Sequence, residues 1–320
     1  MNAYDFDGCI YAGDSTLDFF RYCLKRQPRV ARYLFRQTWG AILYLLGFIN
    51  KTQFKARFFV FLQGVEEINE TVQAFWITHR VKICPWYLAQ QKADDVIISA
   101  SPEFLLYPIC KSLGISQIIA SRVDPKSGEF YGENCFGAQK PERVRAHFGE
   151  ICFEAFYSDS LSDQPMTALA EHSFLVEDDK SVPWNDYRMS VWKKVKCQFF
   201  SPEFIRFLLI GCVNAFNGVL FAYLFSLLLP AQEAFICGYL LSLVISYVMN
   251  SAITFHDSMS VIKMLKFFLS YIPNFIIQNA VVFVLCTLLK QPELLAFIAA
   301  AAIGIPVTFL LLKLFTFRRQ

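Results

Sequence analysis

The chain has 320 residues, the length of two average domains, and its net charge of +3 is too small to indicate a nucleic-acid-binding protein. Hydrophobic residues make up 55% of it, and the mean hydropathy is +0.37. The ten cysteines show no metal-ligand spacing, so they fit reduced thiols better than a disulfide framework. Most charge lies before about residue 197 and long uncharged runs follow it, a pattern that predicts a soluble domain followed by a membrane domain.

Two aspartates lie near the start of the chain. Asp5 and Asp7 are separated by one residue and followed by Gly8. On a strand, alternate side chains face the same way, so both carboxylates share one face. Acids this close repel each other unless a cation or a shared proton compensates. The pair therefore indicates a functional site, with a solvated turn as the alternative, and later segments argue against the turn.

A basic and aromatic region follows the predicted helix N-cap at Asp14. No acidic residue occurs between Asp18 and Glu66, and the apolar run 39–49 in this region is shorter than the roughly 20 residues that a span requires. Apolar residues flanked by Arg and Lys are typical of a helix in the membrane interface. The alternative is a cap whose apolar face packs on its own domain. The basic residues are Arg21, Lys25, Arg26, Arg29, Arg32, Arg36, Lys51, Lys55 and Arg57.

A predicted phosphate-binding position comes next. Residues 96–98 predict a short buried strand, and Ser99 follows it just before a turn that opens a helix at Glu103. A hydroxyl at the carboxyl end of a parallel strand, beside a helix N-terminus, suits phosphate binding.

Two more polar positions follow a second predicted strand at residues 117–120. Lys140 opens a helix whose first turn would direct its amine towards the strand ends. Asp159 ends an apolar strand, and Asp163 lies about one helical turn further on. Carboxylates at a strand end suit Mg²⁺, which prefers hard oxygen ligands.

These segments, in this order, resemble the four motifs of the haloacid dehalogenase superfamily, in its phosphoserine-phosphatase-like branch. The resemblance covers roughly residues 1–180 and implies an α/β Rossmann-like domain with a helical cap at about residues 15–90. The early cap and the run 157–165 look most like membrane-associated lipid phosphatases of the phosphatidylglycerophosphatase type. Cys9 departs from the pattern, because the family usually has Thr or Val there.

The resemblance also implies a role for each matched residue. Asp5 would be the nucleophile that forms an aspartyl-phosphate, and Asp7 would protonate the leaving oxygen and later take a proton from water. Ser99 and Lys140 would hold the phosphoryl oxygens. The implied cofactor is Mg²⁺. Its site would consist of Asp5, the main-chain carbonyl of Asp7, and Asp159, with Asp163 supporting them.

Residues 181–203 read as an amphipathic linker, and residues 204–320 as an all-α domain of four transmembrane helices. The apolar segments are about 204–229, 234–255, 264–289 and 294–315, each long enough to span a bilayer. Basic residues lie in the linker, in the 256–266 connection and at Arg318 and Arg319. By the positive-inside rule, the chain is an integral protein of the cytoplasmic membrane with both termini in the cytoplasm.

The membrane part contains an internal repeat at a spacing of about sixty residues. Phe207 and Asn214 recur as Phe267 and Asn274, and a Thr-Phe pair ends both halves. Two spans per repeat make the halves parallel in topology. These features resemble the GtrA-like family of small four-helix membrane proteins. That family is associated with polyprenyl-phosphate-linked sugars, so the resemblance implies a lipid-phosphate client.

Five residues of the membrane part are candidates for lipid binding. Asn214 and Asn274 would be costly facing lipid, although interhelical hydrogen bonds are an alternative use of such amides. Arg206, Lys263 and Lys266 lie near the cytoplasmic boundary and suit a lipid phosphate, or they only anchor helix ends.

The first interpretation is a Mg²⁺-dependent phosphomonoesterase that acts at the cytoplasmic membrane face on a polyprenyl-linked sugar phosphate or a phospholipid phosphate. The membrane domain would bind or translocate the lipid. One alternative is a lipid-linked sugar transporter with a regulatory soluble domain, and another is a membrane-tethered phosphatase of soluble metabolites. The expected partners are the lipid substrate and the bilayer. A homo-oligomer is also expected, because four helices are few for a translocation path.

Overall fold

The computed structural model describes residues 1–177 and 179–317, which divide into two compact units. The first unit holds residues 1–42 and 49–188. The second holds residues 43–48 and the chain from residue 189 onward. The predicted basic C-terminus, Arg318 and Arg319, lies outside the described residues.

The first unit is built on a six-stranded sheet with the order β3-β2-β1-β4-β5-β6. Every neighbouring pair is parallel except β5 and β6, which are antiparallel. The arrangement confirms the α/β fold class predicted from the sequence. The strands are β1 (Asn2–Tyr4), β2 (Val96–Pro102), β3 (Gln117–Ser121), β4 (Phe153–Ser158), β5 (Ala170–Glu177) and β6 (Lys180–Pro183).

The central strands are apolar on both faces, as a parallel sheet covered by helices requires. Val96, Ile97 and Ile98 of β2 are completely buried. Because β2, β1 and β4 are neighbours and run in the same direction, their carboxyl ends meet at one edge of the sheet. Such an edge is where parallel α/β sheets place ligands.

Helices follow or precede the strands at the predicted positions. Asp14 is the N-cap of α1, since its side chain accepts a hydrogen bond from the Leu17 amide at 2.8 Å. The helix after β2 begins at Glu103, and Lys140 lies in the first turn of α7. The helices are α1 (Ser15–Arg26), α4 (Ile68–His79), α5 (Pro85–Gln90), α6 (Glu103–Ser112) and α7 (Gln139–Phe148).

The cap contains α2 (Leu34–Leu45) and α3 (Lys51–Phe59). The Gln37 side chain of α2 donates to the Phe58 carbonyl of α3 at 2.8 Å. On α2, Phe35, Trp39 and Ile42 recur at helical spacing and are 78%, 53% and 44% exposed. The apolar face of α2 is therefore exposed, and that alternative does not hold for this helix, whereas Phe59 and Phe61 of the cap do pack in the core.

The second unit contains four helices that are long and apolar enough to cross a membrane, as predicted: Pro202–Ser226, Ala231–Thr254, Val261–Leu288 and Ile298–Thr316. Side chains of Ser201 and Ser260 cap the first and third of them. Along the chain the helices are α8 (Val191–Phe199), α9 (Pro202–Ser226), α10 (Ala231–Met249), α11 (Val261–Val282) and α12 (Glu293–Leu311). π-helical segments extend three of them, at Asn250–Thr254, Phe283–Leu288 and Leu312–Thr316.

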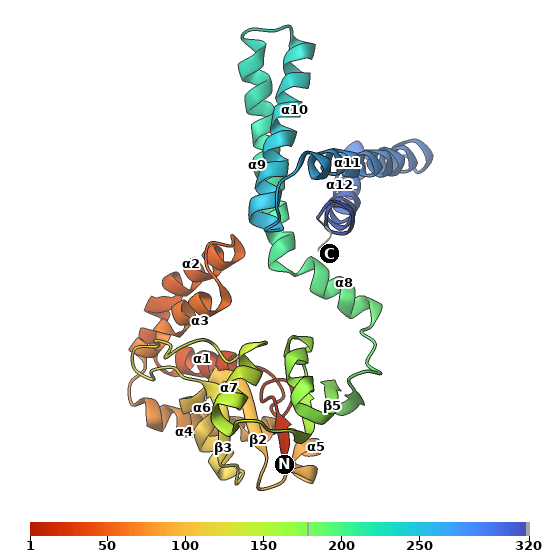
Figure 1. Cartoon of the computed structure of the whole chain (residues 1–320). Coiled ribbons are helices and arrows are strands. Elements are labelled where there is room, and N and C mark those ends of the chain that lie inside the picture. Colours follow the sequence, from red (N-terminus) through yellow and green to blue (C-terminus); the bar gives the residue numbers. More distant parts are fainter. Residues whose placement is uncertain (178, 318–320) are drawn as a thin grey trace. The chain divides into compact units, whose positions relative to one another are not determined.

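The predicted repeat is visible in the packing of the second unit. α9 packs along α10 and α11 packs along α12, so each half is a helical hairpin (Figure 1). The Phe rings that end the two halves, Phe255 and Phe317, stack on each other with centroids 4.4 Å apart. Two further ring contacts are equivalent in the two halves. Tyr247 of the first half contacts Phe267 of the second at 5.6 Å, and Phe309 of the second half contacts Phe207 of the first at 5.4 Å. The aromatic core therefore has an approximate internal two-fold symmetry.

Candidate active site

The edge of the sheet where β1, β2 and β4 end carries the residues predicted for the soluble domain. They surround one cavity of about 400 Å³. Asp5 follows β1, Ser99 lies on β2, and Asp159 follows β4. The predicted residues that line the cavity are Asp5, Asp7, Ser99, Lys140, Asp159 and Asp163.

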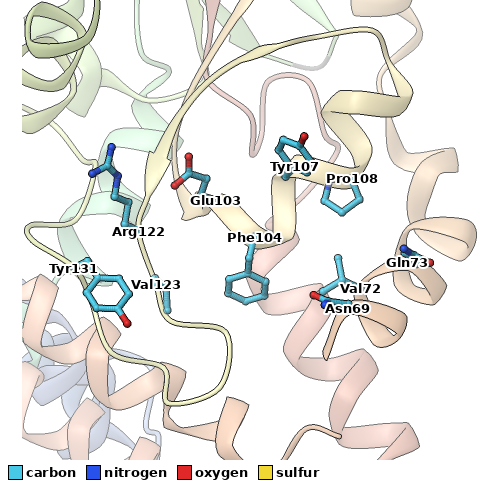
Figure 2. A pocket seen from close by; sticks show the side chains of 10 residues that line it. All are labelled: Asn69, Val72, Gln73, Glu103, Phe104, Tyr107, Pro108, Arg122, Val123 and Tyr131. Carbon is cyan, nitrogen blue, oxygen red and sulfur yellow. The ribbon is translucent and has the colours of Figure 1, made fainter. Parts of the chain in front are cut away.

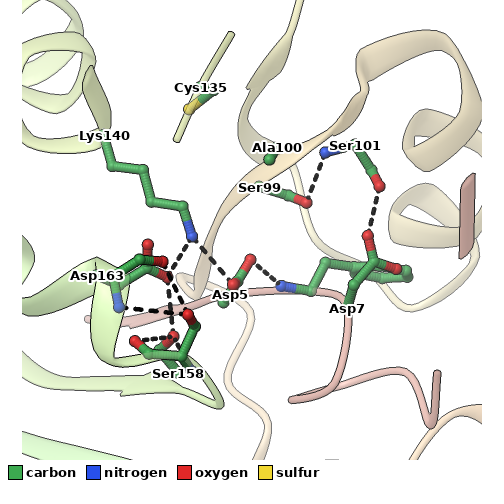
Figure 3. Close-up of polar contacts among 12 residues, drawn as sticks. Asp5, Asp7, Ser99, Ala100, Ser101, Cys135, Lys140, Ser158 and Asp163 are labelled. Carbon is green, nitrogen blue, oxygen red and sulfur yellow. Dashed lines mark hydrogen bonds and ion pairs between the residues drawn. The ribbon is translucent and has the colours of Figure 1, made fainter. Parts of the chain in front are cut away.

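Lys140 is the central cation of this site (Figure 3). Its ammonium lies 3.0 Å from Asp5 Oδ2 and 2.5 Å from Asp163 Oδ2, and its side chain is only 1% exposed. Burial alone would lower the pKa of Lys140, but Asp5 and Asp163 raise it above its usual value. The Ser158 hydroxyl donates to Asp163 at 2.8 Å. Asp163 is thus held by the protein itself, which fits a supporting role.

Asp5 is oriented by its own neighbour in the sequence. The Phe6 amide donates to Asp5 Oδ1 at 2.8 Å, and Lys140 contacts Oδ2. Burial raises the pKa of Asp5 to about 8, Lys140 opposes that rise, and the nearby carboxylates Asp163 and Asp159 add to it. The site therefore concentrates negative charge around the predicted nucleophile.

Asp7 is held by hydrogen bonds from residues that the sequence did not identify as candidates (Figure 3). Ser101 donates to Asp7 Oδ2, and the Ser15 amide donates to Oδ1 at 2.7 Å. Thr16 shares a hydrogen bond of 2.8 Å with Ser101. Burial and then Asp14 raise the pKa of Asp7 to about 6. Ser101 lies two residues beyond Ser99, but the register of β2 shifts between Ser99 and Pro102, so strand alternation alone would not have identified it.

Gly8 leaves the space that the Asp159 carboxylate occupies. A Cβ at Gly8 would overlap Asp159, and the residue has φ +72°, which glycine adopts most readily. The acidic side chain therefore lies directly against the backbone that follows Asp7. Within residues 1–177 and 179–317 there is no group of three or more His, Cys, Asp or Glu side chains placed to hold a metal. A cation site here would need main-chain oxygen as well as carboxylates.

The cap also contributes to the cavity. Lys51 and Lys55 of α3 line it, together with the aromatic rings of Phe54 and Phe58. The sequence interpretation assigned these two lysines to the membrane-facing basic region, and for them it is wrong. The face of α3 that lies towards the strand ends depends on the tertiary packing of the cap. The sequence of α3 alone does not determine it.

Three of the predicted lipid-binding residues are cations with internal contacts. Arg206 is 8% exposed and donates to the Tyr44 carbonyl at 3.0 Å. The ammonium of Lys263 lies 2.8 Å from both oxygens of Asp257. Lys266 lies over the Phe315 ring at 5.5 Å. Of the three, only Lys266 has a side chain with neither a carboxylate partner nor a hydrogen bond among the described residues.

Asn214 and Asn274 share an unusual property. Each has a buried amide oxygen with no hydrogen-bond partner in the described part of the chain. Asn214 lines a cavity of about 550 Å³ between α9 and α10, beside Gly218 and Ser242. In the second repeat, a Cβ on Gly304 would overlap the side chains of Asn274 and Gln278. The position of Gly218 is thus taken by a much larger residue in the other half.

Two other asparagines of the membrane helices, Asn250 and Asn279, make hydrogen bonds within their own helices. Asn250 donates to the Ser246 carbonyl and Asn279 donates to the Phe275 carbonyl, each within its own helix. Between helices, Ser270 and Thr316 share a hydrogen bond of 3.1 Å.

A larger cavity of the first unit lies elsewhere. It has a volume of about 640 Å³ and is lined by α4, α6 and the segment after β3 (Figure 2). Phe104, Arg122 and Tyr131 border it, and none of the predicted site residues does. Size alone therefore does not identify the active site here.

Two family models match the chain. Residues 3–168 match haloacid dehalogenase-like hydrolase, and residues 206–317 match the GtrA/DPMS transmembrane domain.

Curated relatives cover parts of the chain. "Probable phosphatase Rv3661" of Mycobacterium tuberculosis is 34% identical over 98 residues, which are 28% of this chain and 33% of the relative. The matched part thus spans about a third of that relative's length. Protein CicA of Caulobacter vibrioides is 29% identical over 185 residues, covering 53% of this chain and 82% of CicA.

Two solved structures are similar to the first half. A protein of unknown function from Bordetella pertussis Tohama I has a TM-score of 0.44 at 18% identity, covering 54% of this chain and 87% of its own. A phosphoserine phosphohydrolase-like protein from Francisella tularensis has a TM-score of 0.37 at 12% identity. That match covers 56% of this chain and 87% of the Francisella protein.

Proposed function

Because the chain belongs to the haloacid dehalogenase-like hydrolase family, we propose that it hydrolyses a phosphomonoester carried by a membrane lipid. Both resemblances inferred from the sequence are confirmed, since the second half matches the GtrA/DPMS transmembrane domain. With its four apolar helices, the protein is an integral membrane protein. The observation that carries the proposed reaction is the contact of Lys140 with Asp5 at the floor of a cavity that also contains Asp7.

The proposed reaction has two steps. Asp5 reacts in its ionised form, which the Lys140 ammonium favours by lowering the pKa of Asp5, and Asp7 in its protonated form, which burial favours. A carboxylate oxygen of Asp5 attacks phosphorus, so an O–P bond forms while the ester P–O bond breaks, and Asp7 gives its proton to the leaving oxygen. Water then attacks the phosphorus and gives a proton to Asp7, and the bond to Asp5 breaks to release phosphate. Ser101 and the Ser15 amide hold Asp7 in one orientation throughout.

The donor set fits Mg²⁺. Asp5 and Asp159 would supply carboxylate oxygens and Asp7 its main-chain carbonyl, and Gly8 leaves room for Asp159 to approach. Lys140 contacts the carboxylates of Asp5 and Asp163, and Asp159 adds a third negative charge near Asp5, so a divalent cation would offset the excess of negative charge. When bound, Mg²⁺ would neutralise charge on the phosphoryl oxygens. Lys140 holds Asp163 in a supporting position.

The exposed apolar face of α2 supports a lipid substrate. Phe35, Trp39 and Ile42 lie on one side of a cap that also carries many basic residues, the composition of an interfacial helix. Aromatic rings from the same cap, Phe54 and Phe58, form an apolar wall inside the catalytic cavity. Both features suit a substrate that is delivered from a bilayer.

The membrane domain is proposed to hold a lipid. The α9–α10 cavity beside Asn214 is the candidate place, with Lys266 near the boundary for a phosphate. Asn274 occupies the equivalent place in the second repeat. Gly218 lines this cavity, and the equivalent residue of the second repeat is Gln278. Gly218→Gln would therefore partly fill the cavity, so we expect it to weaken lipid binding. Measuring lipid that copurifies with the variant and with the unmodified protein tests this, and unchanged lipid content would contradict it.

A homo-oligomer remains a prediction, and a mass measurement in nanodiscs would test it.

Both termini and the 256–260 connection are proposed to face the cytoplasm. In a variant without reactive native cysteines, Ser258→Cys should react with an impermeant maleimide only from the cytoplasmic side, and Gln291→Cys only from the opposite side. The reverse labelling pattern would contradict this orientation.

The deciding experiment is phosphate release by the full chain in lipid nanodiscs. The substrates are phospholipid phosphates, polyprenyl-linked sugar phosphates and soluble sugar phosphates, with Mg²⁺ or a chelator. Release from a lipid class, abolished by chelation and by Asp5→Asn, is the expected result. Turnover of soluble phosphates alone would indicate a tethered enzyme for soluble metabolites. No release at all would favour a transporter with a regulatory soluble domain.

A further inference from the structure

Two lysines of the cap face the cavity that contains the catalytic carboxylates. Lys51 and Lys55 are one helical turn apart on α3, so both side chains lie on one face of the helix. A capping box fixes where this helix starts, since Asn50 and Gln53 exchange hydrogen bonds of 2.8 Å and 3.0 Å. The sequence thus determines the register that places both lysines together.

In the described part of the chain, neither lysine is in contact with an acidic side chain. The Lys55 ammonium donates to the Ala100 carbonyl at 2.8 Å and to Asn134 Oδ1 at 3.2 Å. The Lys51 ammonium lies 3.1 Å from the centroid of the Phe136 ring. Among the described residues, no carboxylate oxygen lies within 4.0 Å of either ammonium, whereas Lys140 contacts two. Two positive charges therefore face one cavity, and neither forms an ion pair with a residue that the structure describes.

The surroundings make an anion favourable beside these lysines. Burial lowers the pKa of both, and the positive charge of Lys51 lowers the pKa of Lys55 further, to about 8. An anion between the two ammoniums would remove their mutual repulsion and restore the charged form of Lys55. Lys55 contacts the carbonyl of Ala100, the residue after Ser99, so such an anion would lie close to the predicted phosphoryl site.

We infer that Lys51 and Lys55 form a subsite for a second anionic group of the substrate. This inference rests on the proposed function. The substrate would be a phosphomonoester whose leaving group carries another negative group, with an apolar part beyond it. Phe54 and Phe58 are on the same helix and line the same cavity, so the apolar part has a place beside the anion. Through this subsite, the cap would favour lipid phosphates that carry a second anionic group over those that lack one.

The test compares two compounds that differ only in the second charge. One is glycerol phosphate with a hexyl ether, and the other is the same glycerol phosphate with a hexyl phosphodiester in its place. For the full chain in nanodiscs, we expect KM to be about tenfold lower for the diester, the size of one charge-assisted contact. Lys51→Met should remove most of that difference by raising KM for the diester, with kcat little changed.

Matched variants separate recognition from folding. Lys51→Arg should keep the preference for the diester, and Lys111→Met, which changes an exposed lysine in the last turn of α6, should have no effect. Lys55→Met is the second test, with its thermal unfolding measured because Lys55 also ties α3 to Ala100.

The possible results are distinct. Equal turnover of both compounds by the unmodified protein would overturn the subsite and leave the proposed function standing. Equal losses for both compounds in Lys51→Met would also overturn it, because the lysine would then act on the scissile phosphate. If neither these compounds nor any lipid phosphate is hydrolysed, the proposed function itself fails.

Discussion

The ammonium of Lys140 lies 3.0 Å from the carboxylate of Asp5, and the same nitrogen contacts Asp163 at 2.5 Å. One cation from the start of α7 thus joins the end of β1 to the segment after β4. All three side chains are largely withdrawn from solvent, so this contact contributes both to the chemistry of the site and to the stability of the sheet edge.

Replacing Lys140 should therefore affect stability and activity together. Lys140→Met leaves two buried carboxylates without their cation, and breaking a buried pair in this way typically costs about 3–5 kcal/mol. Adding Asp163→Asn removes one of those charges, so we expect part of the stability to return while phosphate release remains absent. Urea unfolding and phosphate release measure the two effects. Lys92→Met, which breaks an exposed pair with Glu154, is the control and should change neither property.

A second prediction concerns the close approach of Asp159 to Gly8. Gly8→Ala should displace Asp159, so the variant should need a much higher Mg²⁺ concentration for half-maximal phosphate release. Gly114→Ala is a matched control, because Gly114 also has a positive φ but no atom within 4 Å of its added Cβ. That variant should lose only about 1–2 kcal/mol of stability to backbone strain. The same Mg²⁺ requirement in both variants would refute the role given to Asp159.

The preference for a doubly anionic substrate should depend on pH through Lys55. Its pKa is lowered to about 8, so the side chain is charged below that pH and loses its proton as the pH rises through it. The groups that act on it are Lys51 on its own helix and Asp14, Asp7 and Asp5 across the cavity. The KM of the ether divided by the KM of the diester should therefore fall between pH 7 and pH 9. In Lys55→Arg, which stays charged, the ratio should remain constant, and a parallel fall in that variant would contradict the prediction.

The stacked rings of the membrane domain provide a fourth prediction. Phe255→Ala and Phe317→Ala should lower the unfolding temperature in nanodiscs by similar amounts, since each removes the same contact, of the order of 1 kcal/mol. The double variant should lose less than the sum of the two. Phe216→Ala, at a position 67% exposed on α9, is the control and should have little effect. Strictly additive losses would show that the two rings do not act as a pair.

Much of the fold and site could be predicted because it depends on short-range rules. Asp5, Ser99 and Asp159 come at or just after apolar strands, and parallel neighbours bring such ends together. The cap at Asp14 and the four apolar spans follow equally local signals.

What could not be predicted depends on the direction in which a side chain turns after folding. Lys51 and Lys55 have the composition of a membrane-facing flank, yet they line the cavity. Lys263 reads as a lipid-phosphate ligand, but a turn brings Asp257 to it. Ser101 was hidden by its neighbour Ser99, because only the folded site shows which hydroxyl reaches Asp7.

The contact between Phe255 and Phe317 has a further consequence. A two-helix protein with one copy of this motif could make the same contact only by meeting a second molecule, and its stability would vary with concentration. Here one polypeptide carries both partners, so closing the aromatic core requires no loss of translational freedom and is independent of how dilute the protein is in the bilayer.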